Sequence, residues 1–490
     1  MNTSPTWFGH PRGLATLFFT EMWERFSYYG MRAILVLALV DAVAHGGMGL
    51  NDQNATAIYG LYTAGIYVLS LAGGWLADRI LGQQRATLIG GMIIALGHFT
   101  MAVPHTITFY LGMLFIALGS GLFKPNISTM VGQLYSRDTR ARRDAGFSVF
   151  YMGINVGALI GQIVCGYLGE RIGWHYGFGA AGVFMLLGLV QFRITRHHLG
   201  DAGILNAADK PDAALLRRTG VVLASALLVL LVIITSVMER WWIFDAIRVA
   251  ENASGVIAII TFGYFIYLFY AGRLTAHELK RVALILIMVA GSILFWSGFE
   301  QAGSSFNLFA ERYTDRFISG WEMPASWLQS VNSFFIITLA PVFASLWLRL
   351  GARQMDPSIP VKFGLGLIQL GLGFLVLYFA SRFVVLGDKV SPGWLVTTYL
   401  LHSTGELCLS PVGLSEVSRL APKRYAAQLM GTWFMSIAMG NALGGLIAGH
   451  LGSDAVNEMP YRFLMVFAGT AGVGLLLLLL TRWINKLDDN

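Results

Sequence analysis

Long apolar segments separated by short polar stretches recur along the whole chain. A helix needs roughly 20 apolar residues to cross the hydrocarbon core of a bilayer. Segments of this kind predict six spans in the first part of the chain, near residues 14–42, 54–77, 86–103, 107–130, 145–168 and 175–195. Eight more follow a polar linker at 195–219, near residues 220–238, 253–272, 281–302, 326–348, 362–380, 393–417, 427–450 and 461–485. The pattern predicts an all-α polytopic membrane protein with fourteen transmembrane helices and both termini on one side.

The composition agrees with a membrane protein. Of the 490 residues, 56% are hydrophobic and 12% are charged, whereas soluble domains carry about 25% charged residues. The cysteines are Cys165 and Cys408, both in apolar segments, so we expect neither a disulfide framework nor a metal site built on cysteines. The first span is too long and too charged for a signal peptide, so no cleavable leader is expected.

The basic residues alternate between the two sides of the predicted membrane. Lysine and arginine concentrate in the loops on the side of the N-terminus, and such an excess is typical of cytoplasmic loops. Both termini are therefore predicted to be cytoplasmic, and the net charge of +7 is explained by topology rather than by nucleic-acid binding. Of the 34 basic residues, Arg25, Arg32 and Lys124 remain inside predicted spans. These three are candidates for function.

The first span carries an unusual stripe of polar groups. At 100° per residue, Glu21, Glu24, Arg25, Tyr28 and Arg32 fall on one face about 100° wide. A charge at the bilayer centre costs at least about 2.5 to 3.5 kcal/mol, so this face is expected to line a bundle interior or a watery cavity. The alternative is a purely structural ion pair, because Glu21 and Arg25 are spaced i, i+4.

Three further charged residues lie in other spans. Lys124 precedes Pro125 in the fourth span, and its alternative is snorkelling to the membrane surface. Glu300 lies near the outer end of the span at 281–302, and Glu406 lies in the middle of the span at 393–417. Glu406 can alternatively stay protonated and hydrogen-bond a neighbouring helix. His402 is spaced i, i+4 from Glu406, but with no third ligand nearby we expect no metal.

A weak internal repeat predicts two related halves. A basic, glycine-containing turn follows the second span at residues 75–85, and a similar turn follows the corresponding later span at 345–353. The segment 74–79, with Gly82 and Arg85, resembles the signature loop of the major facilitator superfamily. The resemblance implies 12 core helices in two six-helix bundles at residues 1–200 and 281–490, with a linker and two additional helices at 201–280.

Several motifs resemble those of the proton-dependent oligopeptide transporter family. They are the Glu-x-x-Glu-Arg-Phe-x-Tyr-Tyr-Gly-Met-Arg run at 21–32, Lys-Pro-Asn at 124–126, Phe-Tyr-x-x-Ile-Asn-x-Gly at 150–157, and Ser-Pro-x-Gly-Leu at 410–414. The resemblance covers nearly the whole chain, and the two extra helices match prokaryotic members. It implies a bacterial inner-membrane symporter, not an enzyme, that imports di- and tripeptides by alternating access. The proton gradient would drive it without a cofactor.

The resemblance also implies roles for residues that match the family pattern. Proton coupling is expected at Glu21, Glu24, Arg25 and Glu300, and an extracellular gate at Arg32 and Glu300, with Lys124 as a further gate residue. The peptide-binding residues implied are Arg25, Tyr28, Tyr29, Arg32, Tyr67, Lys124, Asn155, Trp296, Asn332, Glu406 and Trp433. The second-helix histidine of animal members has no evident counterpart here, which puts any mechanism that depends on it in doubt.

The chemistry of a small peptide fits these residue types. A carrier for many peptides must recognise the two charged ends and hold the side chains loosely. Arg25 and Lys124 can receive the carboxylate, Glu406 and Asn155 the amine, and tryptophans and tyrosines can form tolerant walls. For a single Trp or Tyr, packing or an interfacial belt remains an alternative. Asn155 and Asn332 can equally serve as hydrogen bonds between helices.

Other functional classes are disfavoured. The chain has no His-Glu-x-x-His or Gly-x-Ser-x-Gly pattern for an intramembrane enzyme and no phosphate-binding loop for direct ATP drive. The buried charges are arranged asymmetrically, and no filter-like segment is repeated along the chain. Both features argue against a channel, which uses rings of residues or repeated pore loops. The alternative within transporters is a related facilitator for drugs or other small organic anions. We expect membrane lipid, peptides and protons as partners, no nucleic acid, and function as a monomer.

Overall fold

The computed structural model describes residues 6–135, 140–205, 211–239, 244–451 and 453–487, and of these it leaves the side chains of 140, 141, 234, 237, 238, 410–412, 414 and 453–455 undescribed. The described residues contain 14 long helices. The first half holds α1 (Arg12–Val40), α2 (Asp52–Leu76), α3 (Gln83–Met101), α4 (Thr106–Leu134), α5 (Arg140–Arg171) and α6 (Trp174–Thr195). The second half holds α9 (Ala276–Phe299), α11 (Trp327–Ala352), α12 (Ile359–Val385), α13 (Gly393–Leu420), α14 (Ala426–Leu451) and α15 (Met459–Leu479).

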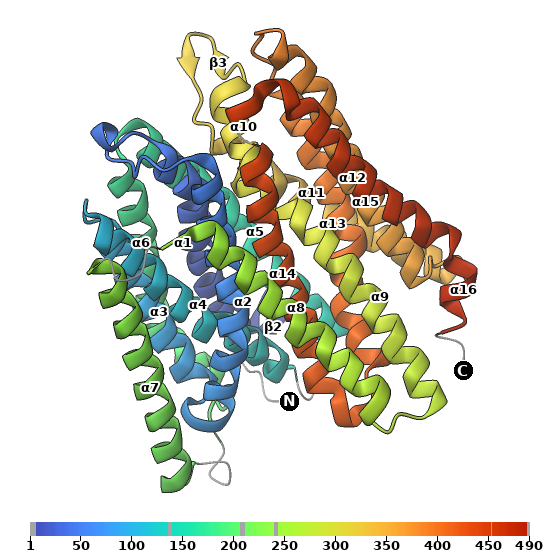
Figure 1. Cartoon of the computed structure of the whole chain (residues 1–490). Coiled ribbons are helices and arrows are strands. Elements are labelled where there is room, and N and C mark those ends of the chain that lie inside the picture. Colours follow the sequence, from blue (N-terminus) through green and yellow to red (C-terminus); the bar gives the residue numbers. More distant parts are fainter. Residues whose placement is uncertain (1–5, 136–139, 206–210, 240–243, 452, 488–490) are drawn as a thin grey trace.

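Two additional helices, α7 (Ala213–Met238) and α8 (Ala246–Ala271), lie between the halves in sequence. In Figure 1, α7 stands at the edge of the first half, and α8 crosses in front of α2 and α14. The apolar side chains of α7 face outward along its length, with Leu228 63% exposed. Every predicted span is therefore confirmed as a helix, with ends that differ by a few residues, while the predicted domain boundaries remain a prediction.

Short elements were not predicted, because hydropathy over a membrane-length window does not detect them. They include α10 (Ser305–Tyr313), α16 (Thr481–Asn485) and two antiparallel hairpins, β1 (Thr6–Trp7) with β2 (His10–Pro11) and β3 (Phe317–Ile318) with β4 (Trp321–Glu322). Short helical turns are η1 (Val43–His45), the π-helical η2 (Ala77–Leu81), η3 (Arg196–Leu199), η5 (Glu300–Gly303), η6 (Lys423–Tyr425) and η7 (Ser453–Glu458).

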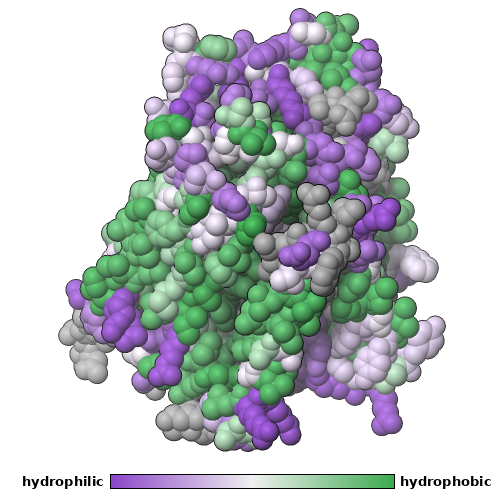
Figure 2. Space-filling view, turned by 60° about the vertical axis from the view of Figure 1, so that its left-hand side comes forward, coloured by the Kyte–Doolittle hydropathy of each residue, from purple (hydrophilic) through white to green (hydrophobic). Residues whose placement is uncertain are grey.

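The helices lie roughly side by side and define two ends of the molecule. Figure 1 shows α10 and β3 at one end and α16 at the other. We call the end with α10 and the β3–β4 hairpin the distal end, where α1 ends and α2 begins, and the opposite end the proximal end. Figure 2 shows a broad hydrophobic face over the middle of the molecule and hydrophilic residues gathered at its ends, as a bilayer requires.

Local sequence signals explain where several helices begin. The Asn51 side chain accepts a hydrogen bond of 2.9 Å from the Asn54 backbone and caps α2. At α9, Thr275 and Glu278 form a reciprocal capping box. These side chains satisfy backbone N–H groups that the first helical turn leaves free.

Glycines bring α5 and α1 into backbone contact beside the charged stripe. A Cβ atom on Gly157 would collide with the carbonyl oxygen of Met22, and one on Gly161 would collide with that of Phe26. Only glycine permits this approach. The packing fixes α1 against α5 at the level of Glu21, Glu24 and Arg25, so it positions the candidate site.

Candidate functional site

The charged stripe of α1 forms one compact cluster. Arg25 Nε lies 2.6 Å from Glu21 Oε1 and 3.3 Å from Glu24 Oε2. Both carboxylates are buried, with exposures of 1% and 0%, while the Arg25 side chain is 11% exposed. The pair spaced i, i+4 forms as predicted, and Glu24 joins the same guanidinium from the neighbouring position.

Arg25 satisfies the hydrogen-bonding groups of the Glu21 and Glu24 carboxylates only in part. Glu21 Oε2 and both oxygens of Glu24 have no hydrogen-bond partner among the described residues. An ionised carboxylate that is buried without full pairing is costly and readily becomes neutral by taking up a proton. A structural ion pair alone would not require two buried carboxylates around one arginine, so the cluster can hold a proton.

Lys124 of α4 points into the first half. Its Nζ lies 3.8 Å from the ring centroid of Tyr28 on α1 and 5.4 Å from that of Tyr67 on α2. Glu21 and Glu24 also interact with it electrostatically. An ammonium held over ring faces of two other helices is a cation–π arrangement, and this position argues against snorkelling to the membrane surface.

Arg32 and Glu300 join the two halves, as predicted. The Arg32 Nη2 atom lies 2.7 Å from Glu300 Oε2, and both side chains are at least nine-tenths buried. The guanidinium also lies 5.5 Å from the ring centroid of Tyr29 and 5.6 Å from that of Tyr59. Because Arg32 belongs to α1 and Glu300 follows α9 directly, the ion pair ties the first helix of one half to the first helix of the other. The described residues show no ion pair between Lys124 and Glu300.

Glu406 of α13 faces the same space from the second half. It interacts electrostatically with Glu300 and Arg32, and Asn332 of α11 lies within its hydrogen-bonding reach. The Asn332 amide also donates a 2.8 Å hydrogen bond to Ser403 Oγ, one turn earlier on α13. Asn332 therefore acts as a link between helices and at the same time positions Glu406.

Tyr151 and Asn155 complete this side of the site from α5. Tyr151 interacts with Glu406 and Tyr29, although 38% of its surface is exposed in the middle of a helix. Asn155 is buried and donates to the Tyr151 carbonyl oxygen at 3.0 Å. Both halves of the protein therefore contribute neighbours to Tyr151.

The two predicted tryptophans lie inside the second half. Trp296 packs edge-on against Phe295 and Phe299 of its own helix. Trp433 is 3% exposed and packs against Phe363, with its ring tip on Gly413 of α13. Among the described residues, no ion pair, hydrogen bond or ring contact joins Trp433 to a charged side chain, so its position fits helix packing as well as a pocket wall.

No group of three or more potential metal ligands occurs in the described part of the chain. His402 packs instead among the rings of Phe299, Phe306 and Phe374, with Nε2 3.1 Å from the Leu370 carbonyl oxygen. The Ser410–Leu414 motif includes side chains outside the described residues.

Some residues of the site were not predicted from the sequence. They are Tyr59, Tyr151 and Ser403, which contact Arg32, Asn155 or Asn332. These side chains are uncharged, so burying them costs little free energy. They therefore give no signal like that of a charged residue in a membrane span. Ser403 had one usable signal, its i, i−3 position on the face of Glu406.

Comparison with known proteins identifies the family to which the chain belongs. A model of the POT family matches residues 61–459. The chain belongs to the POT family. It is 41% identical over 497 residues to the peptide transporter YePEPT of Yersinia enterocolitica, covering 99% of this chain and 96% of that protein. It is 35% identical to a di-/tripeptide transporter of Lactococcus lactis, covering 99% and 98%.

Solved structures of POT proteins share the fold. The crystal structure of a peptide transporter POT in complex with sulfate has a TM-score of 0.91 and 39% identity, covering 99% of this chain and 97% of that one. A POT family transporter in complex with 5-aminolevulinic acid has a TM-score of 0.88 and 32% identity, with 98% of each chain covered. The protein is therefore a membrane transporter of the major facilitator fold and not an enzyme.

Proposed function

We propose that this POT family protein is a proton-coupled symporter that imports di- and tripeptides by alternating access. The observation that carries the proposal is the charge arrangement of the site. The first half presents Arg25 and Lys124, and the second half presents Glu406 beside Asn332. A peptide with a carboxylate at one end and an ammonium at the other can bridge the two halves between these groups. The names of the relatives support this substrate class.

Proton coupling is assigned to the cluster around Arg25. A peptide carboxylate that recruits Arg25 competes with Glu21 and Glu24 for the same guanidinium, which lies 2.6 Å and 3.3 Å from them. The carboxylates that lose this partner remain buried, and protonation removes the cost of their charge. Peptide and proton thereby favour each other's binding. The proton gradient alone supplies the drive in this scheme, without a cofactor.

We place both termini in the cytoplasm of a bacterium and the distal end outside its inner membrane, from the lysine and arginine bias of the loops. The halves meet at the distal end through Arg32–Glu300, Asp52–Arg312 and Arg171–Glu322. In this orientation these contacts close the site to the outside. Each chain contains both halves of the site, so we propose that a monomer transports.

A carrier for other small amino-carboxylates is the second candidate function. The POT transporter solved with 5-aminolevulinic acid shows that a relative holds a small ligand with both an amine and a carboxylate. This alternative predicts that uptake of 5-aminolevulinic acid is competed poorly by dipeptides. Peptide import predicts strong competition by dipeptides and none by free amino acids.

The coupling assignment is tested with Glu21→Gln and Glu24→Gln in proteoliposomes. Each variant should lose peptide accumulation driven by a pH gradient, because the glutamine cannot exchange a proton and only one carboxylate is left to compete with the peptide for Arg25. Each should retain peptide exchange. Glu251→Gln, on the exposed surface of α8, serves as the control and should accumulate peptide normally. If both site variants still accumulate peptide against its gradient, the proton is carried elsewhere.

A further inference from the structure

The start of α11 at the distal end is not capped by its own segment. Ser326 precedes the helix with φ −59° and ψ −23°, its side chain makes no capping hydrogen bond within α11, and the first turn contains no acidic residue. The N–H groups of residues 327–329 bond to the carbonyl oxygens of residues 324–326. The N–H groups of Ala325 and Ser326, directly before the helix, therefore need a partner from another segment. Ala325 and Ser326 are both fully buried, so an N–H group left unpaired there is costly.

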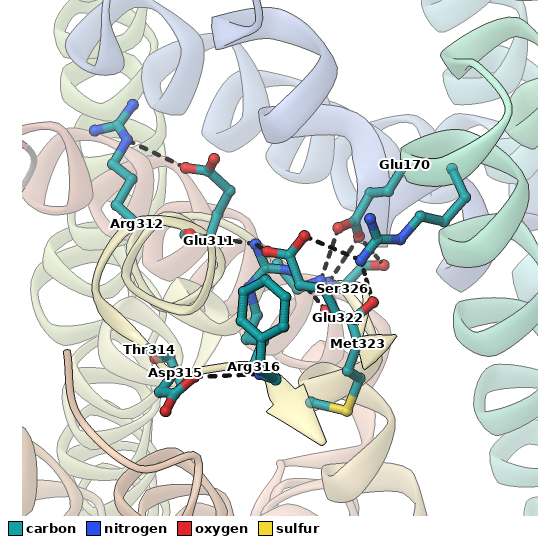
Figure 3. A network of polar contacts seen from close by, with 12 residues as sticks. Glu170, Glu311, Arg312, Thr314, Asp315, Arg316, Glu322, Met323 and Ser326 are labelled. Atoms are coloured by element: carbon teal, nitrogen blue, oxygen red, sulfur yellow. Dashed lines mark hydrogen bonds and ion pairs between the residues drawn. The ribbon is translucent and has the colours of Figure 1, made fainter. Parts of the chain in front are cut away.

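Glu170, near the end of α5, supplies the missing cap from the other half. Its Oε2 accepts a 2.7 Å hydrogen bond from the Ala325 N–H, and its Oε1 accepts bonds of 2.9 Å from the Ser326 N–H and 2.5 Å from Ser326 Oγ (Figure 3). The positive end of the α11 dipole favours a carboxylate at this place. One side chain of the first half thus satisfies three donors of the second.

Two further contacts dock the same stretch of α5 on α11. Gly166 lies one turn before Glu170, and a Cβ atom there would collide with Ser326 Oγ. One turn earlier still, the Ile163 carbonyl oxygen accepts a 2.9 Å hydrogen bond from Trp327 Nε1. The last turns of α5 therefore fit the start of α11 closely, with the Ser326 side chain packed directly against Gly166.

The neighbouring ion pairs are of a different kind. Glu322 lies 3.3 Å from Arg171 Nη2 and 2.8 Å from Arg316 Nη2, and the Glu322 side chain is 30% exposed (Figure 3). Solvent screens such pairs, which contribute little to stability. Glu322 therefore provides a matched comparison, because it lies in the same network but does not contact the first N–H groups of α11.

We propose that Glu170 is a positioning residue that holds the distal end closed by capping α11 and must release it in each transport cycle. The inference rests on the proposed alternating access, in which α5 and α11 separate when the distal end opens. That separation leaves the Ala325 and Ser326 N–H groups without their acceptor. Glu170 therefore favours the distal-closed state over the distal-open one and adds to the Arg32–Glu300 gate from a different pair of helices.

Glu170→Gln tests this role with little change of size. The glutamine amide presents N–H groups where the carboxylate accepted hydrogen bonds, so at least one donor of α11 loses its partner. We expect the ratio of distal-open to distal-closed molecules to rise about tenfold, since hydrogen bonds to a charged group are lost. Gly166→Ala should act in the same direction by pushing Ser326 away, and it covers the case in which Glu170→Gln does not fold.

The populations can be measured by the distance between spin labels at positions 45 and 388, exposed sites on the distal loops of the two halves. The labels are attached in a Cys165→Ala/Cys408→Ala background, so that only the introduced cysteines can react. Both native cysteines are free and buried. The proposal predicts a larger long-distance population for Glu170→Gln and an unchanged one for Glu322→Gln. It is overturned if Glu170→Gln leaves the distances unchanged, or if Glu322→Gln shifts them equally.

The distances are recorded without peptide or gradient, so they decide the role of Glu170 even if peptide uptake fails. Thermal unfolding of the same variants distinguishes a role in holding the distal end closed from a general role in stability. If Glu170 holds the distal end closed, its substitution shifts the distance distribution and leaves the unfolding midpoint close to that of the parent. Loss of stability with an unchanged distance distribution in the folded fraction would contradict the proposal.

Discussion

Glu406, like Glu300, is an acidic residue that the second half contributes to the charged site. Its substitution distinguishes a role in peptide binding from a structural role. If it meets the peptide ammonium, Glu406→Gln removes a charge-assisted contact worth about 1.5 to 3 kcal/mol. A normal dipeptide should then bind about ten- to a hundredfold more weakly, while its des-amino analogue should change little. Binding of both ligands is measured by competition in proteoliposomes, with Glu251→Gln as the control. Equal losses for the two ligands would assign Glu406 a structural role through Asn332.

The ion pair between Arg32 and Glu300 allows a charge-exchange test with single-residue substitutions. Each single reversal, Arg32→Glu or Glu300→Arg, places two like charges together in a buried position, and breaking a buried pair costs about 3 to 5 kcal/mol. Each should abolish uptake. The double variant restores opposite charges at a separation that was 2.7 Å and should recover part of the activity. The gate assignment fails if the double variant remains as inactive as the single ones.

At the scale of elements, the contact between α1 and α5 holds the charged stripe in place. Gly157→Ala would force its new methyl group against the Met22 carbonyl oxygen, and such overpacking costs about 1 to 3 kcal/mol. We expect a lower thermal unfolding midpoint and impaired uptake. Gly220→Ala on α7 is the matched control, because nothing lies within 4 Å of the added atom, and there alanine should slightly raise helix stability. Similar midpoints for the two variants would contradict the role given to this contact.

The long helices and the charged part of the site could be predicted from the sequence because both have a large energetic signal. Bilayer thickness fixes the length of a span, and the burial cost of a charge singles out Arg25, Lys124 and Glu406. The short α10 and the β3–β4 hairpin have no such signal. Neither does Glu170, which beside Arg171 at the end of a span is indistinguishable from an ordinary interfacial charge; its role depends on the position of α11, more than 150 residues later.

At the scale of the molecule, the two halves are joined at the distal end by buried and half-buried polar contacts. Gly60 of α2 and Gly445 of α14 add a close backbone approach, since a Cβ atom on Gly60 would lie 3.0 Å from the Gly445 Cα atom. In the proposed alternating access, opening this end separates these contacts together, so the closed state must exchange with an open one. Ligand binding can shift this exchange only through contacts that differ between the two states.

Uptake by proteoliposomes under imposed gradients tests whether the protein couples peptide import to protons. Labelled dipeptide is supplied outside vesicles that contain the purified protein, with an acidic outside, an inside-negative potential, both or neither. Proton-coupled peptide import predicts accumulation above the external concentration only when a proton-driving gradient is present. It also predicts collapse of that accumulation by a protonophore, and competition by unlabelled di- and tripeptides but not by free amino acids. Equal peptide levels inside and outside under every gradient, or accumulation that dipeptides do not compete, would contradict it.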